Sequence, residues 1–222
     1  MKRIALAALF FLGAASSALS QSPRGGGASL PVSRYVLPNG MTFLFLRKPG
    51  APTVSFMTQF RAGGVDEWTG ISGTAHLFEH MLFKGTPTLG TRNYAAEQAM
   101  FPRIDAAADS LTAEFRKGAS ADTALLTRLR ARLRQLEDSS RQVVVSNELD
   151  RILKRNGAVG LNASPFNDGT NYFFSLPANR AELWFVLESD RIRHPVMREL
   201  YSERDVVMEE RRMRTETHPF GL

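Results

Sequence analysis

The most informative stretch of the sequence reads GTAHLFEHMLFKGT and covers residues 73–86. Its pattern predicts a helix in which His76 and His80, four residues apart, lie on one face. Two imidazoles one turn apart can bind one Zn²⁺. On the surface of this helix Glu79 lies to one side of the two histidines, so its carboxylate can reach a metal-bound water without being a ligand. The stretch therefore predicts a metal site on a helix.

A hydrolytic zinc site explains why these residue types occur together. Such a site takes three protein ligands and leaves one position for water, whose pKa the metal lowers to about 7. A nearby carboxylate then accepts the proton, and the metal polarises the substrate carbonyl. The order His-x-x-Glu-His reverses His-Glu-x-x-His and marks the inverzincin pattern. Because the chain has no cysteine, we expect the third ligand to be a carboxylate.

The last predicted helix offers this carboxylate in the run ERDVVMEE, residues 203–210. Glu203 and Glu210 are seven residues apart, which is two helical turns, so they share a face. On chemistry alone, either Glu209 or Glu210 can be the third ligand.

An ordinary solvated helix face is the alternative interpretation of the His-Glu-His group, since a pattern with three fixed positions often arises by chance. Here, however, the group lies among large apolar residues that include Leu77, Phe78 and Met81. Three titratable groups on so apolar a helix are costly unless a partner satisfies them. The apolar surroundings therefore favour the metal site.

Composition narrows the class of protein. The chain of 222 residues is 43% hydrophobic and 23% charged, which is ordinary globular composition for one domain or slightly more. The absence of cysteine excludes a disulfide framework, a catalytic thiol and any cysteine-based zinc site. The net charge of +6 favours a basic solvated surface, because no Lys/Arg block is interleaved with aromatic residues. We therefore expect no nucleic-acid partner.

Residues 1–20 are typical of a secretory signal peptide, with a basic start, an apolar run and small residues that predict cleavage before Gln21. The run is short for a transmembrane helix, so no stable membrane anchor is expected. An uncleaved N-terminal anchor is the alternative. The sequence thus predicts a periplasmic or secreted protein, in which residues 21–32 form a flexible lead-in.

The first predicted elements are strands. Asn39-Gly40 between two apolar runs predicts a hairpin in which both turn residues have positive φ. A third strand is predicted over residues 53–60. The helix with the two histidines follows, capped by Ser72 or Thr74.

Residues 91–156 are predicted to be largely helical. Apolar residues recur at steps of three and four on both sides of residues 117–120, which predicts an αα-hairpin with one apolar stripe on each arm. The stripe of the first arm includes Phe115. Pro102 either kinks this region or starts a helix afresh.

The remaining pattern predicts strands over residues 158–163 and 171–176. Helices are predicted over residues 180–193 and about 203–215, the second of them capped by Ser202. The order of elements predicts an α+β fold, in which helices cover an antiparallel-rich sheet.

The sequence resembles the pitrilysin/insulinase family of zinc metallopeptidases, which includes the mitochondrial processing peptidases. The resemblance rests on GTAHLFEHMLFKGT, and on LNA, TNY, LPA and ERDVVMEE in family order. It covers roughly residues 33–216 and implies a pitrilysin-like, processing-peptidase-like α+β domain.

By position, the resemblance implies that His76 and His80 are zinc ligands and that Glu79 is the general base. The family motif closes on a glutamate seven residues after another, which selects Glu210 rather than Glu209 as the third ligand. Glu203 is then the second acidic residue of the catalytic site and supports it from outside the ligand set.

The resemblance also implies a place for substrate. Asn162 and Ala163 match the edge strand on which the family is thought to hold a peptide by backbone pairing. Pro165 follows them and cannot donate to a strand ladder, so the strand is expected to end or bulge there. Tyr172 matches an aromatic residue near the site, without an assigned role.

Two departures from the family concern the extent of the chain. The separation of His80 from Glu210 exceeds the usual family gap, so the helical region at about residues 95–150 is expected to be an insertion. Family enzymes enclose a chamber between two homologous domains, whereas this sequence contains one. Residues 33–222 are therefore expected to be a truncated N-terminal metallopeptidase domain, completed by a second homologous domain or a partner subunit.

The resemblance implies a zinc-dependent endopeptidase that hydrolyses peptides or unfolded polypeptide segments and that is inactive without its second domain. The alternative is a peptide-binding or assembly subunit that keeps the fold but does not cleave. The complete set of histidines and glutamates favours the enzyme.

Overall fold

The computed structural model describes residues 30–215, which divide into one unit up to Gly50 and a second from Ala51. The signal peptide predicted for residues 1–20 lies outside the described residues, as does most of the lead-in. Among the residues that are described, no helix combines the length and the apolar character needed to cross a membrane.

The first unit contains an antiparallel hairpin of β1 (Val32–Val36) and β2 (Thr42–Leu46). In the connecting turn the Gly40 N–H donates to the carbonyl of Leu37 over 2.9 Å. Only the glycine has a positive φ, of 86°, so the prediction that Asn39 also takes this conformation is wrong. The Leu37 N–H also donates to the Met41 carbonyl, so three residues form the loop, and a loop of this length is commonly a type I turn followed by a single left-handed residue.

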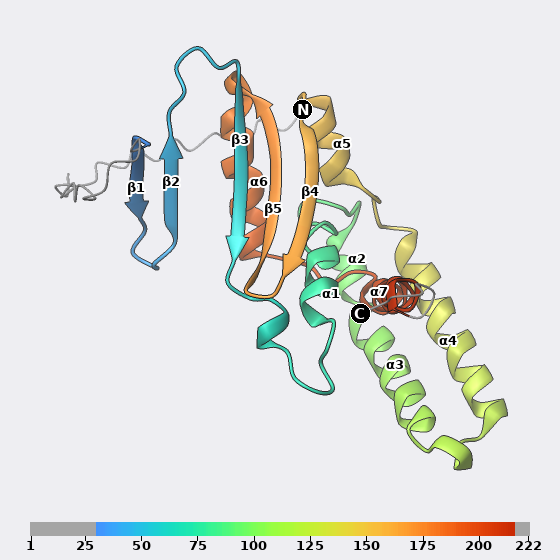
Figure 1. Cartoon of the computed structure of the whole chain (residues 1–222). Helices are drawn as coiled ribbons and strands as arrows, with labels where there is room; N and C mark the ends of the chain where they lie inside the picture. Colours follow the sequence, from blue (N-terminus) through green and yellow to red (C-terminus); the bar gives the residue numbers. More distant parts are fainter. Residues whose placement is uncertain (1–29, 216–222) are drawn as a thin grey trace, which may run out of the picture. The chain divides into compact units, whose positions relative to one another are not determined.

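The second unit is built on a three-stranded antiparallel sheet in the order β3-β5-β4. These strands are β3 (Thr53–Phe60), β4 (Val159–Phe166) and β5 (Gly169–Pro177). The sheet and the helices around it confirm the predicted α+β class with an antiparallel-rich sheet (Figure 1).

Strand β4 lies at the edge of this sheet and is longer than predicted. Pro165 pairs with Thr170 and the strand continues to Phe166, so the expected end or bulge at the proline is wrong. The register shift occurs earlier, between Val159 and Asn162. A proline is tolerated here because an edge strand does not need every N–H for the ladder.

One face of the sheet packs against α6 (Ala181–Arg193), which lies behind β3 and β5 in Figure 1. The Trp184 ring stacks on Phe56, with 4.9 Å between centroids, and Phe56 also contacts Phe174. Met57 points to the opposite face and is 63% exposed. The sheet is therefore covered on one side by a helix, as an antiparallel sheet commonly is.

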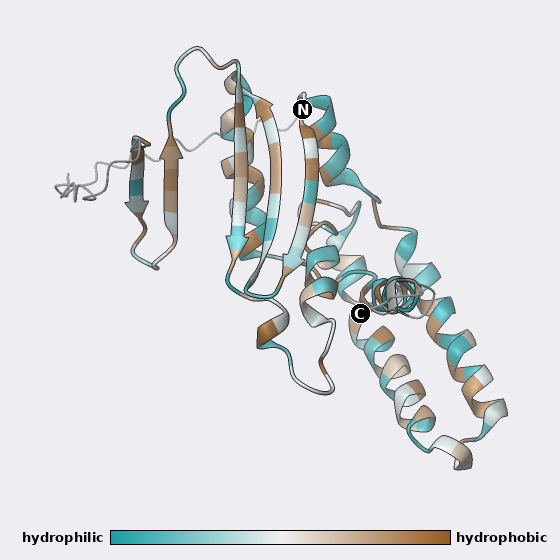
Figure 2. Ribbon diagram, viewed as in Figure 1, coloured by the Kyte–Doolittle hydropathy of each residue, from teal (hydrophilic) through white to brown (hydrophobic). Residues whose placement is uncertain are grey.

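The predicted αα-hairpin is confirmed as α3 (Phe101–Phe115) and α4 (Thr123–Arg141), which we call the helical arm. Pro102 lies in the first turn of α3, where its missing N–H costs nothing. Both helices carry apolar and polar residues along their length (Figure 2). The buried contact between them is formed by Ile104, Ala107, Ala108, Leu133 and Leu136.

Phe115 is a correction to the predicted stripe of the arm. Its side chain is 65% exposed, because it lies at the last residue of α3, beyond the region that α4 covers. The apolar period continued past the end of the packed interface, so periodicity alone placed it in the core.

Short helices complete the second unit: α1 (Thr74–Met81), α2 (Tyr94–Gln98), α5 (Glu148–Arg155) and the longer α7 (Leu200–Thr215). Helix α7 begins before its predicted start, so Ser202 lies in its first turn and is not the cap. The Ser202 hydroxyl donates to the carbonyl of Glu199 over 3.1 Å instead. Helix α7 packs against α1, which also contacts β4.

Candidate metal centre

Helix α1 is capped by a carboxylate from outside the helix. The two oxygens of Glu67 accept hydrogen bonds from the N–H groups of Gly73 and Ala75, each over 2.7 Å. Neither Ser72 nor Thr74 caps the helix as predicted: the N-cap is Gly73, at φ 95°, and the Thr74 hydroxyl donates to the carbonyl of Ile71. A carboxylate at this end also favours the helix through the helix dipole.

The other end of α1 is held by side chains from the sheet and from α6. The Tyr172 hydroxyl, in a residue 5% exposed, donates to the Phe78 carbonyl over 3.5 Å. Arg191 Nε donates to the Leu82 carbonyl over 2.9 Å. Burial, and then the charge of Glu79, raise the pKa of Tyr172 well above its usual range. Tyr172 therefore supports the helix as a neutral hydroxyl in the core.

The structure brings the predicted ligand residues together. His76 Nε2 lies 3.3 Å from Glu210 Oε2, and His80 Nε2 lies 4.0 Å from Glu210 Oε1. Each of the three offers one donor atom within 4.8 Å of the other two. The imidazole rings meet edge to face, with 5.0 Å between their centroids. Helix α1 supplies both histidines, and the packed helix α7 supplies the carboxylate.

Glu79 lies next to this cluster, with its Oε2 3.7 Å from His76 Nε2 and its side chain 14% exposed. Glu209, the alternative ligand on chemistry alone, lies elsewhere on α7: it is 57% exposed and pairs with Arg212 over 2.8 Å. The geometry thus places Glu210, and not Glu209, beside the histidines.

Glu203 lies behind His80, one step from the ligand cluster. Its Oε2 is 3.0 Å from His80 Nδ1, and its Oε1 accepts from Lys84 Nζ over 2.6 Å. Burial alone raises the pKa of Glu203, but the hydrogen bonds from Lys84 and His80 outweigh it and lower the pKa below its usual value. Glu203 is therefore a carboxylate that accepts from both neighbours.

The donor set fits zinc. Two imidazole nitrogens and one carboxylate oxygen are the ligand types of hydrolytic zinc sites, and a fourth position remains for water. All three side chains are only partly buried, with exposures of 17%, 21% and 28% in sequence order, so solvent reaches the cluster.

A cavity of about 480 Å³ opens beside His80 and Glu79. Its walls include Lys84 from the loop after α1, and Val145 and Asn147 from the segment that follows the helical arm. This segment is held in place because the Val145 N–H donates to the Gly90 carbonyl over 2.9 Å. A segment outside the His-x-x-Glu-His stretch therefore forms part of the surroundings of the metal centre.

The predicted substrate residues lie on edge strand β4. Asn162 pairs with Phe173 and Ala163 with Tyr172, the residue whose hydroxyl reaches α1. The Ala163 N–H donates to the side-chain carbonyl of Asn162 over 2.9 Å. The edge position leaves one side of the strand without a partner strand among the described residues, so the substrate role stays a prediction.

Two residues that support the site were not predicted from the sequence: Lys84, which contacts Glu203, and Glu67, which caps α1. Lys84 is four residues after His80, so continued helical spacing offered a signal for it. Glu67 lies in the loop after the third strand, six residues before the glycine it caps, and no local pattern marks it.

Comparisons with known proteins agree with this fold. Residues 42–110 match the family model described as Insulinase (Peptidase family M16). Uncharacterized zinc proteases of Mycobacterium tuberculosis and Mycobacterium bovis are 35% identical over 68 residues, which is 31% of this chain and 16% of theirs. The crystal structure of a protease from Helicobacter pylori matches 86% of this chain with a TM-score of 0.57 and 23% identity, and thus shares the fold.

The matched segment carries the His-x-x-Glu-His signature on α1. Over residues 42–110 the chain is similar to the insulinase (M16) peptidase family, in agreement with the resemblance that its sequence shows. The chain spans 33% of the length of the Helicobacter pylori protease, and its matched segment spans 16% of the length of the mycobacterial zinc proteases.

Proposed function

We propose that the protein is a zinc-dependent endopeptidase that hydrolyses peptides or unfolded polypeptide segments. The observation that carries the proposal is the convergence of His76, His80 and Glu210, with donor atoms within 4.8 Å of one another, beside the carboxylate of Glu79. These three residues would hold the ion. The names of the mycobacterial relatives as zinc proteases support the same metal.

Different residues of the chain would have different roles in hydrolysis. When bound, Zn²⁺ supplies Lewis-acid chemistry that polarises a peptide carbonyl and acidifies a water molecule. Glu79 would take the proton at its carboxylate and return it to the leaving amine, as a general acid-base residue does. Glu203 accepts from Nδ1 of His80 and so directs the other ring nitrogen, Nε2, toward the ligand cluster.

Edge strand β4 supports a peptide as the substrate. An extended peptide can add to an exposed sheet edge by main-chain hydrogen bonds, which recognise the backbone more than the side chains. Asn162 and Ala163 lie on this strand, and the strand contacts α1. This arrangement suits unfolded segments, because a folded substrate has no free extended backbone to offer.

We further propose that the active enzyme needs a second homologous domain, on this polypeptide or on a partner subunit, and that this chain alone is inactive. The family implies the second domain, and the chain spans a third of the matched solved structure. Export to the periplasm or outside the cell is proposed from residues 1–20 of the sequence.

Replacement of the general base tests the proposal in the full-length protein. Glu79→Gln is expected to keep zinc bound and to lower the hydrolysis of an unstructured peptide by about a hundredfold or more. Glu209→Gln, on the exposed side of α7, is the matched control and should leave hydrolysis unchanged. Peptidase activity that survives Glu79→Gln contradicts the assignment, whereas zinc-loaded wild type without activity on any unfolded substrate supports the non-cleaving subunit instead.

A further inference from the structure

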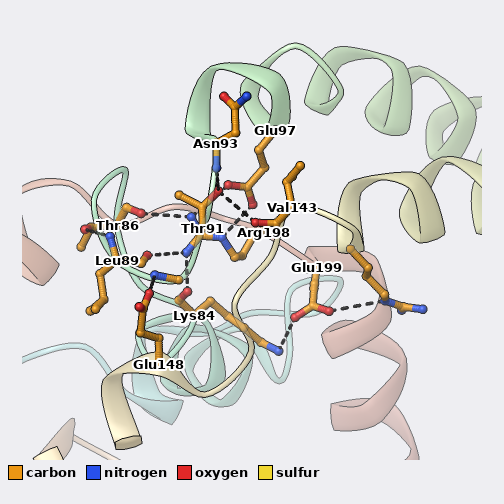
Figure 3. Close-up of polar contacts among 12 residues, drawn as sticks. Lys84, Thr86, Leu89, Thr91, Asn93, Glu97, Val143, Glu148, Arg198 and Glu199 are labelled. Atoms are coloured by element: carbon orange, nitrogen blue, oxygen red, sulfur yellow. Dashed lines mark hydrogen bonds and ion pairs between the residues drawn. The ribbon is translucent and has the colours of Figure 1, made fainter. Parts of the chain in front are cut away.

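A network of charged side chains lies behind the metal centre. Lys84, in the loop after α1, donates to Glu203 Oε1 over 2.6 Å and to Glu199 Oε2 over 2.9 Å. The other oxygen of Glu199 lies 3.4 Å from Nε of Arg141, the last residue of α4 in the helical arm. Figure 3 shows Lys84 and Glu199 joined in this way. This network therefore connects the helical arm with Glu203, which contacts His80.

The two oxygens of Glu203 have different partners, and this division determines how the carboxylate acts on His80. Lys84 contacts one oxygen, and the other lies 3.0 Å from His80 Nδ1. A carboxylate only accepts, so Nδ1 must carry the proton of this hydrogen bond. His80 Nε2 then keeps its lone pair, and it is this nitrogen that faces Glu210 Oε1 at 4.0 Å.

The loop that carries Lys84 is fixed by a buried arginine. Arg198 is 1% exposed, and its Nη1 donates to the carbonyls of Lys84 and Leu89 over 2.5 and 2.8 Å. Glu199 follows Arg198 directly and has a left-handed backbone, with φ 58°. The two acceptors of the lysine thus lie on α7 and just before it, and the lysine backbone is tied to the same region (Figure 3).

We propose that Lys84 is a positioning residue for the metal centre, which, together with Glu199, holds Glu203 in the orientation that keeps His80 Nε2 directed at the ligand cluster. Arg141 joins the helical arm to this network through Glu199. The inference rests on the proposed zinc site and names residues that act on it without touching the ion.

A positioning role predicts a larger effect on metal affinity than on stability. Replacement of Lys84 leaves each carboxylate a second partner, His80 for Glu203 and Arg141 for Glu199, so we expect only a modest loss of stability. Residues that orient a metal ligand, in contrast, typically change metal affinity about 10- to 100-fold when they are replaced. Lys84 acts one residue further from the ion, so we expect a loss of about threefold to tenfold.

Zinc affinity, measured by competition with a fluorescent chelator in the full-length protein, tests the proposal. Lys84→Met is expected to raise the zinc Kd about threefold to tenfold, with little change in the Tm of the metal-free protein. Lys84→Arg keeps the charge and the donors and should restore affinity to nearly that of the wild type. Lys154→Met is the matched control, because Lys154 is 68% exposed and pairs only within α5 in the described structure.

The outcomes separate this inference from the proposed function. Wild-type zinc affinity in Lys84→Met, or an arginine variant as weak as the methionine one, overturns the positioning role while the zinc site stands. A wild-type protein that binds no zinc overturns both. If Lys84→Met does not fold, Glu199→Gln takes its place: it weakens the second acceptor of the lysine, and an unchanged zinc Kd overturns the proposal.

Discussion

Arg198 and Glu97 form an ion pair that is almost completely removed from solvent, with 2.7 Å between Nε and Oε1 and exposures of 1% and 0%. The remaining nitrogens of the guanidinium donate to the carbonyls of Lys84, Thr86 and Leu89. The pair joins α2 to the start of α7, and it also fixes the loop that follows the two histidines (Figure 3).

Arg198→Met should therefore be strongly destabilising. It leaves Glu97 as a buried charge without its partner and removes a donor from three carbonyls, and breaking a buried pair costs about 3–5 kcal/mol. Urea unfolding of the metal-free protein measures the loss. Arg212→Met is the control, since the ion pair of Arg212 with Glu209 is on the surface. This substitution should change the free energy of unfolding by less than about 0.5 kcal/mol. Equal effects of the two substitutions would show that the buried pair has no special role.

The cap of α1 gives a second prediction. Glu67→Ala removes the acceptor of the Gly73 and Ala75 N–H groups, and loss of a helix cap costs about 0.5–2 kcal/mol. The free energy of unfolding should fall by this amount, and zinc affinity should fall with it because the helix that carries both histidines frays. A stability equal to that of Glu209→Ala, measured in the same urea titration, would contradict the capping role.

Asp190 gives a prediction about pH. Burial raises the pKa of its carboxyl, but hydrogen bonds from Thr86, His194 and Thr88 outweigh burial and hold the pKa below its ordinary value of 3.8. A pKa lowered by folding means that the unfolded chain takes up the proton first. The stabilisation is thus complete above the ordinary value and is lost as pH falls through the folded value.

Asp190→Asn should consequently destabilise the protein more at pH 5 than at pH 3. Urea unfolding of wild type and variant at both pH values gives the two differences. A difference that stays constant with pH, or that grows as the pH falls, would show that the hydrogen bonds do not favour the charged carboxylate.

The sequence predicted the parts of the site that depend on helical spacing. His76 and His80 share a face because they are one turn apart, and Glu203 and Glu210 share a face because they are two turns apart. Which of Glu209 and Glu210 lies beside the histidines depended on the family resemblance, since spacing alone does not say which face of α7 packs on α1.

The structure differs from the predictions where a distant residue takes over a local role. Ser72 and Thr74 are ordinary capping residues, yet Glu67 supplies the cap from a loop. The neighbours of Lys84, on α7 and just before it, are more than a hundred residues away, and no local pattern shows such contacts. Pro165 was expected to end its strand, but the edge position of β4 removes that constraint.

The zinc content of the purified full-length protein tests the central claim most directly. Wild type and Glu209→Gln should each bind one zinc ion per chain at the His76, His80 and Glu210 cluster, whereas Glu210→Gln should lose zinc on dialysis because a neutral amide replaces the carboxylate ligand. Absence of zinc from the wild type, or equal zinc retention by the two variants, would contradict the account.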